Sequence, residues 1–164
     1  MKKFITNLIL LLLINILISV YLSGISLLNV VPAIDLTILV VYAANSDRNE
    51  AVIFGFLMGL IVDIFFGTTF GFNTLLYMYL GLGVNYISKR FLSNEPLIVL
   101  WLLLVTVLVF DFSHFFFFLM FEGKTFGLRF LFKIVIPELI YTSILYFPMQ
   151  ALVLKYKRFL KKVC

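Results

Sequence analysis

The sequence predicts an all-α polytopic membrane protein, a single transmembrane domain over residues 1–164 with about six transmembrane helices. Three observations predict it. Hydrophobic residues make up 63% of the 164 residues, against about 45–50% in soluble proteins. Charged residues make up only 13%, against about 25%, so few polar side chains remain to cover an apolar surface in water. Apolar stretches of membrane-spanning length also follow one another with short polar turns between them.

The first apolar stretch, Phe4–Leu28, contains no charged residue. It is long enough to cross a bilayer core of about 30 Å at about 1.5 Å per helical residue. Lys2 and Lys3 precede it, as basic residues do in a signal peptide. A cleavable signal peptide has a shorter apolar region and then a small-residue cleavage site, and neither is found here. We therefore expect this segment to be retained as a membrane helix.

Two shorter apolar stretches come next, Val31–Asn45 and Ala51–Phe66, joined by a polar turn at 46–50. Each is near the lower length limit for a membrane span. They are either two short membrane helices or a hairpin that dips into the protein interior. In the second case four full spans remain, and both termini still share one side of the membrane.

Three clearer spans complete the predicted set of six. They cover Phe70–Ser88, Pro96–Phe121 and Phe130–Leu154. Because the connections are short, we expect no catalytic or binding module outside the bilayer. A chain of this kind binds through its transmembrane surface, holds a small ligand between helices, or assembles partners.

Positive charges predict the orientation. With both termini in the cytoplasm, ten of the 13 Lys and Arg residues lie inside and three outside, which is the bias that the positive-inside rule expects. The inner residues are Lys2, Lys3, Arg48, Lys89, Arg90, Lys155, Lys157, Arg158, Lys161 and Lys162, and the outer ones are Lys124, Arg129 and Lys133.

The basic tail at 155–162 mixes Lys and Arg with aromatic residues. Nucleic acid and anionic lipid headgroups both bind segments of this composition. The simpler interpretation, which we prefer, is a topology anchor that extends the last helix. The net charge of +5 arises mostly in this tail, so it does not indicate a nucleic-acid partner.

Four acids lie in or at the edges of the predicted spans: Asp35, Asp63, Asp111 and Glu138. A charge near the bilayer centre costs at least about 2.5–3.5 kcal/mol, so such residues need a partner or a function. His114 follows Asp111 by one helical turn, which predicts an intramembrane polar pair on one helix face. We interpret this pair as structural, with transport and partner binding as the alternatives.

No catalytic or metal-binding arrangement is indicated. The chain has one histidine and one cysteine, Cys164, whereas a zinc site wants three or four ligands, commonly His or Cys. The lone histidine lies in a run of phenylalanines without a nucleophile, and there is no phosphate-binding glycine loop. We therefore expect a protein that is not an enzyme and takes no metal or cofactor.

Gly55 and Gly59 form a G-x-x-x-G spacing, and Asp63 follows one turn later on the same helix face. Glycines at this spacing let two helix backbones approach closely in lipid. Gly67 and Gly71 then surround a tight outer turn. We predict that the stripe is a packed interior face, that the next helix leaves the turn near Gly71, and that Asp63 is a buried, hydrogen-bonded cap on that turn.

These stretches together resemble the rod shape-determining protein MreD family. They are the proline-led segment 31–39, the helix 55–63 with the pattern G-F-x-x-G-x-x-x-D, and the glycine turn 67–71. Their order and spacing match the family, and the length and the basic tail agree as well. The second half resembles the family only in its hydropathy and its closing proline-containing helix, so the resemblance gives no role to Asp111, His114 or Glu138.

The resemblance implies a non-enzymatic subunit of the machinery that elongates rod-shaped bacteria, located in the bacterial cytoplasmic membrane. Its fold would be similar to the substrate-binding membrane subunits of energy-coupling-factor vitamin transporters, with six helices around a central cavity. The expected partner is MreC, and beyond it the MreB filament, the RodA glycan polymerase and a class B penicillin-binding protein. The positions that match the family motif, as fold-forming or partner-facing residues, are Pro32, Asp35, Gly55, Gly59, Asp63, Gly67 and Gly71.

Two hypotheses from different classes follow. The first is a scaffold, which needs no ligand and forms a stable complex with a single-span partner. The second is a substrate-binding subunit of a vitamin transporter on the same fold, with Asp35, Asp63 and Asn73 at a cavity near the outer face. The outer loops are short and poor in polar groups, which disfavours the second. Membrane lipid in the cavity is compatible with either.

Overall fold

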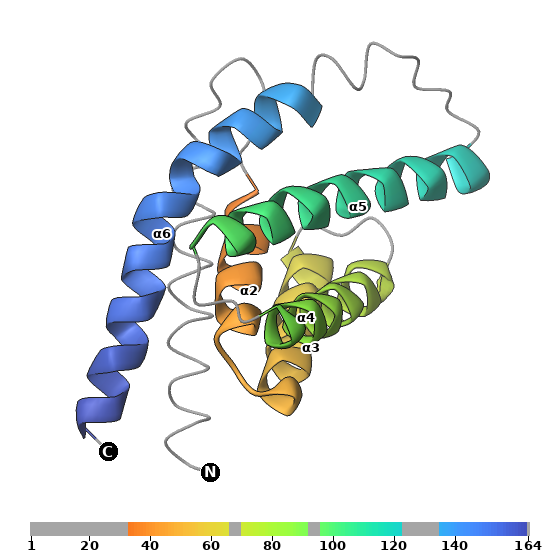
Figure 1. The fold of residues 1–164 in the computed structure, drawn as a ribbon. Coiled ribbons are helices and arrows are strands. Elements are labelled where there is room, and N and C mark those ends of the chain that lie inside the picture. The colour runs from red at the N-terminus through yellow and green to blue at the C-terminus, as the bar shows by residue number, and fades with distance from the viewer. Residues whose placement is uncertain (1–32, 66–69, 92–95, 123–134, 164) are drawn as a thin grey trace.

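The computed structural model describes residues 33–65, 70–91, 96–122 and 135–163. All regular elements in these ranges are helices (Figure 1). They are α2 (Ile34–Ala44), α3 (Arg48–Phe65), α4 (Phe72–Arg90), α5 (Pro96–Glu122) and α6 (Ile136–Val163). The predicted span Phe4–Leu28 lies outside the described residues.

The short helix α2 is the centre of the fold. It contacts α3, α4, α5 and α6, and in Figure 1 it lies between α6 and the α3–α4 pair. Leu36, Leu39, Val40 and Val41 are fully buried. A helix that is apolar on all sides is stable only when other elements surround it, and α2 is enclosed in this way.

The helix boundaries differ from the predicted segments where local chemistry decides them. Helix α3 begins at Arg48, inside the predicted polar turn, and the Ala51 N–H donates to the Asp47 carbonyl at 2.9 Å. Helix α4 begins after Gly71, whose φ of 100° is a left-handed conformation that favours glycine. Helix α6 continues past Leu154 into the basic tail.

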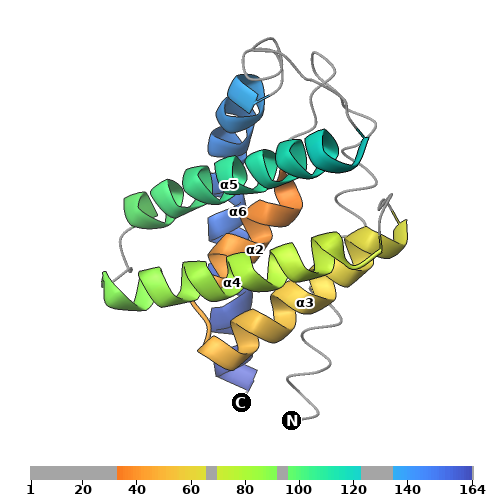
Figure 2. The same cartoon turned by 90° about the vertical axis from the view of Figure 1, so that its right-hand side faces the viewer.

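The axes of helices α3, α4 and α5 are similarly inclined in Figure 2, with the chain running in the opposite direction in α4, and α6 passes behind them. Large apolar side chains are exposed on all four of these helices, among them Ile53, Tyr79, Trp101 and Ile144. Soluble monomers rarely expose so much apolar surface. Among the described residues, Pro96–Phe117 is long and apolar enough to cross a membrane, and Ile34–Ala44 is a shorter apolar helix.

Side chains from distant helices satisfy the backbone groups at both ends of α2. At its start, the Ala33 N–H donates to Thr142 Oγ1 of α6 at 3.3 Å. At its end, Asn85 Nδ2 of α4 donates to the carbonyls of Ala43 and Ser46, each at 2.8 Å. The last carbonyls of a helix have no partner within the helix, so these bonds replace water at a buried end.

Candidate functional site

Helices α3 and α4 touch through their backbones at glycines. A Cβ atom added to Gly55 would lie 2.5 Å from the Tyr77 carbonyl oxygen, and one added to Gly59 would lie 2.5 Å from the Asn73 carbonyl oxygen. From the other side, a Cβ on Gly81 of α4 would lie 2.9 Å from the Ala51 carbonyl oxygen. No residue with a Cβ atom fits at such distances, so the glycine stripe of α3 is the face that packs against α4.

Asp63, near the end of α3, accepts hydrogen bonds from the residues at the start of α4. Its Oδ2 accepts from the Gly71 N–H at 3.0 Å, from the Thr74 N–H at 2.8 Å and from the Thr74 hydroxyl. Its Oδ1 accepts from the Asn73 N–H at 3.2 Å. Asp63 is 4% exposed. The first N–H groups of a helix lack partners within it and attract negative charge, so this carboxylate caps α4 from the preceding helix.

Asp35 and Tyr77 join α2 to α4. The Tyr77 hydroxyl donates to Asp35 Oδ2, and the tyrosine side chain is fully buried. Glu138 of α6 is close enough to interact electrostatically with Asp35. Asp35 thus lies on α2 at its contact with α4, and α2 also packs against α6.

Removing the Tyr77 hydroxyl is expected to destabilise the fold. Tyr77→Phe leaves Asp35 Oδ2 without this donor, and a buried polar group left without its partner costs about 1–3 kcal/mol. Thermal unfolding in mild detergent measures the effect. Tyr79→Phe is the matched control, because Tyr79 lies on the same helix and is 64% exposed. Equal melting temperatures for the two variants would contradict the assignment.

Asp111 and His114 are one turn apart on α5, but the hydrogen bond of the histidine ring goes to another helix. His114 Nε2 lies 2.9 Å from Asn73 Oδ1 of α4. Asp111 Oδ2 is buried and has no hydrogen-bond partner among the described residues. The facing helix thus supplies His114 with an acceptor that the spacing along α5 does not reveal.

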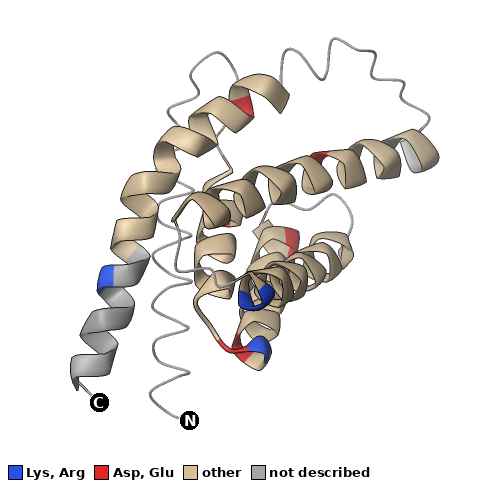
Figure 3. Ribbon diagram, viewed as in Figure 1, with Lys and Arg blue, Asp and Glu red and all other residues tan. Residues whose placement is uncertain are grey.

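The carboxyl groups of Asp111 on α5 and Glu138 on α6 lie within electrostatic reach of each other. In Figure 3 the Lys and Arg positions of the described residues lie in the lower half of the view, and the acids of α5 and α6 lie in the upper half. Within the described ranges no three His, Cys, Asp or Glu side chains are arranged to hold a metal ion.

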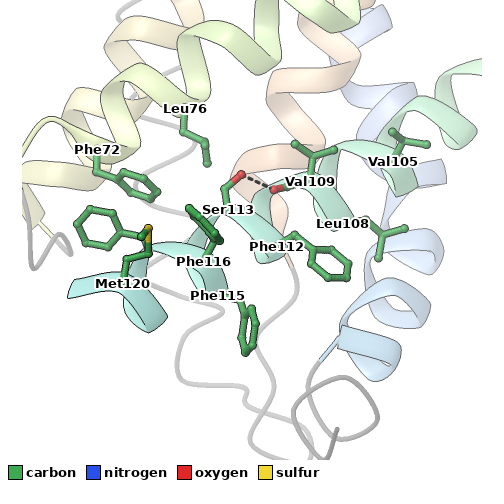
Figure 4. Close-up of a pocket in the computed structure, with 11 residues that line it drawn as sticks. Phe72, Leu76, Val105, Leu108, Val109, Phe112, Ser113, Phe115, Phe116 and Met120 are labelled. Atoms are coloured by element: carbon green, nitrogen blue, oxygen red, sulfur yellow. Dashed lines mark hydrogen bonds between the residues drawn. The ribbon is translucent and has the colours of Figure 1, made fainter. Parts of the chain in front are cut away.

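An open apolar groove of about 930 Å³ lies between the start of α4 and the second half of α5 (Figure 4). Phe72 and Leu76 line it from α4, and aromatic side chains such as Phe112 and Phe116 line it from α5. The Ser113 hydroxyl also lines it but donates to the Val109 carbonyl of its own helix at 2.6 Å. The run of phenylalanines in α5 is visible in the sequence, but the groove is not predicted from it.

Two of the predicted motif positions, Pro32 and Gly67, lie outside the described residues. Tyr77 and Thr74 are not among the residues predicted from the sequence, and Asn73 is predicted only as a transporter residue. A local signal exists for Asn73 and Thr74, because polar residues just after a turn glycine often take part in capping. No local signal marks Tyr77, because its partner lies 42 residues away.

Comparison with known proteins gives a match at the level of a family. A family model described as rod shape-determining protein MreD matches residues 1–160. No curated protein and no solved structure matches the chain.

Proposed function

The chain belongs to the rod shape-determining protein MreD family and is a membrane protein with a role in rod shape determination, and from this membership we propose that it is a non-enzymatic scaffold of the bacterial cell-elongation complex. It binds MreC through its transmembrane surface. Through MreC it connects the MreB filament with peptidoglycan synthesis by RodA and a class B penicillin-binding protein. The observation that carries the proposal is the family match over residues 1–160.

The proposed topology has six membrane segments in one domain, with both termini in the cytoplasm and a fold similar to that of the energy-coupling-factor substrate subunits. The segments are 4–28, 31–45, 51–66, 70–88, 96–121 and 130–154. The exposed apolar side chains of α3 to α6 support lipid surroundings. The basic positions at the start of α3 and the end of α4 support a common cytoplasmic side for these two ends.

The contacts of the polar residues also favour a scaffold. A substrate site needs polar groups that converge on a ligand. Asp35 accepts from Tyr77, Asp63 accepts from the start of α4, and Asn73 bonds His114. These three side chains, which the transporter hypothesis placed at a cavity, thus bond neighbouring helices instead. The comparisons likewise give the vitamin-transporter alternative no support.

Within the motif, we assign Gly55, Gly59 and Asp63 to fold formation. Their close contacts are with α4, and Asp63 is buried. A partner helix therefore meets other surfaces, and the exposed apolar faces of α5 and α6 offer them. Asp35 is fold-forming for the same reason, through its bond to Tyr77.

Co-purification in mild detergent tests the scaffold. We expect a tagged full-length chain to recover MreC, and tagged MreC to recover this chain, with mass spectrometry identifying every bound protein and small molecule. An unrelated multi-pass membrane protein with the same tag is the control for carry-over. A chain that carries a vitamin-sized ligand or an ATPase-linked transport module, and no elongation protein, would overturn the proposal.

A further inference from the structure

Helices α3 and α5 hold α4 in different ways, and α2 packs against it as well. On one side, α3 meets it backbone to backbone, and added Cβ atoms at Gly55 and Gly59 would overlap α4. On the other side, α5 meets it through side chains. Packed helices slide on one another where side chains can change rotamer, whereas a joint between bare backbones leaves no such freedom. The α3–α4 pair is therefore a rigid unit, and α5 is attached to it more adjustably.

The side-chain joint centres on one polar bond. His114 Nε2 of α5 lies 2.9 Å from Asn73 Oδ1 of α4. An amide oxygen only accepts, so the histidine donates Nε2–H. Phe72 and Phe110 hold the ring in place, with ring centroids 5.1 Å and 4.5 Å from that of His114. Packed rings from both helices, Phe72 of α4 and Phe110 of α5, therefore fix the direction of the bond.

The acceptor is fixed on the α4 side. Asn73 is 7% exposed, and its N–H donates to Asp63 Oδ1 at 3.2 Å, within the cap that joins α3 to α4. A movement of the Asn73 backbone would therefore break the cap. The bond to His114 therefore links α5 to a residue, Asn73, that also takes part in the cap between α3 and α4.

The groove opens beside this bond. Phe72, next to Asn73, lines it from α4, and Ser113, next to His114, lines it from α5. Figure 4 shows Leu76 of α4 projecting toward the α5 side chains across the opening. The separation of the two helices at Asn73 and His114 consequently sets the width of the groove.

We propose that the Asn73–His114 hydrogen bond is a latch that holds α5 against the rigid α3–α4 unit and keeps the groove at its present width. When the latch opens, α5 shifts relative to α4 while α3 and α4 stay together. The latch is a conformational device within the fold, and it stands independently of which partner the protein binds.

Distance measurements between spin labels test the latch on the full-length chain in detergent or lipid. The native cysteine is first removed by Cys164→Ser. Labels at Leu75→Cys on α4 and Leu119→Cys on α5 report the latched joint, because both positions are exposed and neither lines the groove. Labels at Ile53→Cys on α3 and Leu75→Cys report the rigid joint.

Two variants open the latch. His114→Phe keeps an aromatic ring against Phe72 and removes the donor, and Asn73→Ala removes the acceptor. We expect each to broaden the α4–α5 distance distribution and to shift its mean, with the α3–α4 distribution unchanged. His114→Gln, which retains an N–H donor, is expected to restore most of the narrow distribution.

Ser113→Ala is the matched control, since it removes a neighbouring hydroxyl whose bond stays within α5. It is expected to leave both distributions unchanged. An unchanged α4–α5 distribution in His114→Phe or in Asn73→Ala would overturn the latch. So would an equal change in both helix pairs, because that would mean a general loss of packing.

Discussion

Replacing Gly55 and Gly59 together by leucine is expected to abolish accumulation of the folded protein in the membrane. The Cβ atom alone would lie 2.5 Å from a carbonyl oxygen of α4 at either position, and at Gly59 also 2.6 Å from the Thr74 Cα. Backbone atoms cannot rotate aside as a side chain does, so the helices must separate. The cost should exceed the roughly 1–3 kcal/mol typical of overpacked cores. Immunoblots of membrane fractions and complementation of cell shape measure the loss.

Gly83→Leu is the matched control for this double variant. Gly83 lies on α4, and a Cβ added there meets no atom within 4 Å. The substitution adds the same side chain to the same helix pair, and in a helix leucine is preferred over glycine. Normal accumulation and cell shape are expected. Full retention of both in the Gly55→Leu, Gly59→Leu protein would show that the two backbones do not touch there.

Replacing Asp63 by leucine is the single substitution with the largest expected effect. It removes both acceptor oxygens from the start of α4 and leaves the N–H groups of Gly71, Asn73 and Thr74 without their acceptor beside an apolar side chain. Each hydrogen bond to a charged group contributes about 1.5–3 kcal/mol, and a buried donor without a partner is costly. We expect loss of the folded protein or a large fall in its unfolding temperature in detergent.

Asp63→Asn separates hydrogen bonding from charge. Its amide oxygen can take the place of Oδ2, which accepts from Gly71 and Thr74, and only the bond from the Asn73 N–H is lost. We expect this variant to retain function and most of the stability. Thr74→Val, which removes only the hydroxyl donor, should have a smaller effect than Asp63→Leu. If the leucine variant is as stable as the asparagine variant, the cap is not what holds this turn.

Features that depend on local spacing could be predicted from the sequence. The glycines of α3 recur every fourth residue, and Asp63 follows at the same interval before a turn with Gly71, so their shared face was visible in the pattern. The all-helical composition of the described ranges follows from apolar stretches too long for strands. The predicted start of the next helix near Gly71 is confirmed, since α4 begins at Phe72, directly after this glycine with its positive φ.

Features that depend on which helices face each other could not be predicted. His114 and Asn73 are 41 residues apart, and Tyr77 and Asp35 are 42 apart. Spacing along α5 offered Asp111 as the nearest polar neighbour of His114, but the structure places Asn73 against the ring. The groove is hidden in the sequence for the same reason, because the phenylalanines of α5 form it only together with Phe72 and Leu76 of α4.

The small size of α2 has a consequence for biosynthesis. At 11 residues it is about 16 Å long, roughly half the thickness of the hydrocarbon core. The side chains that satisfy its last carbonyls, Asn85 and Ser88, are translated some forty residues later. We therefore expect α2 to stay with the insertion machinery until α4 has been made, and α2, α3 and α4 to enter the membrane as a group.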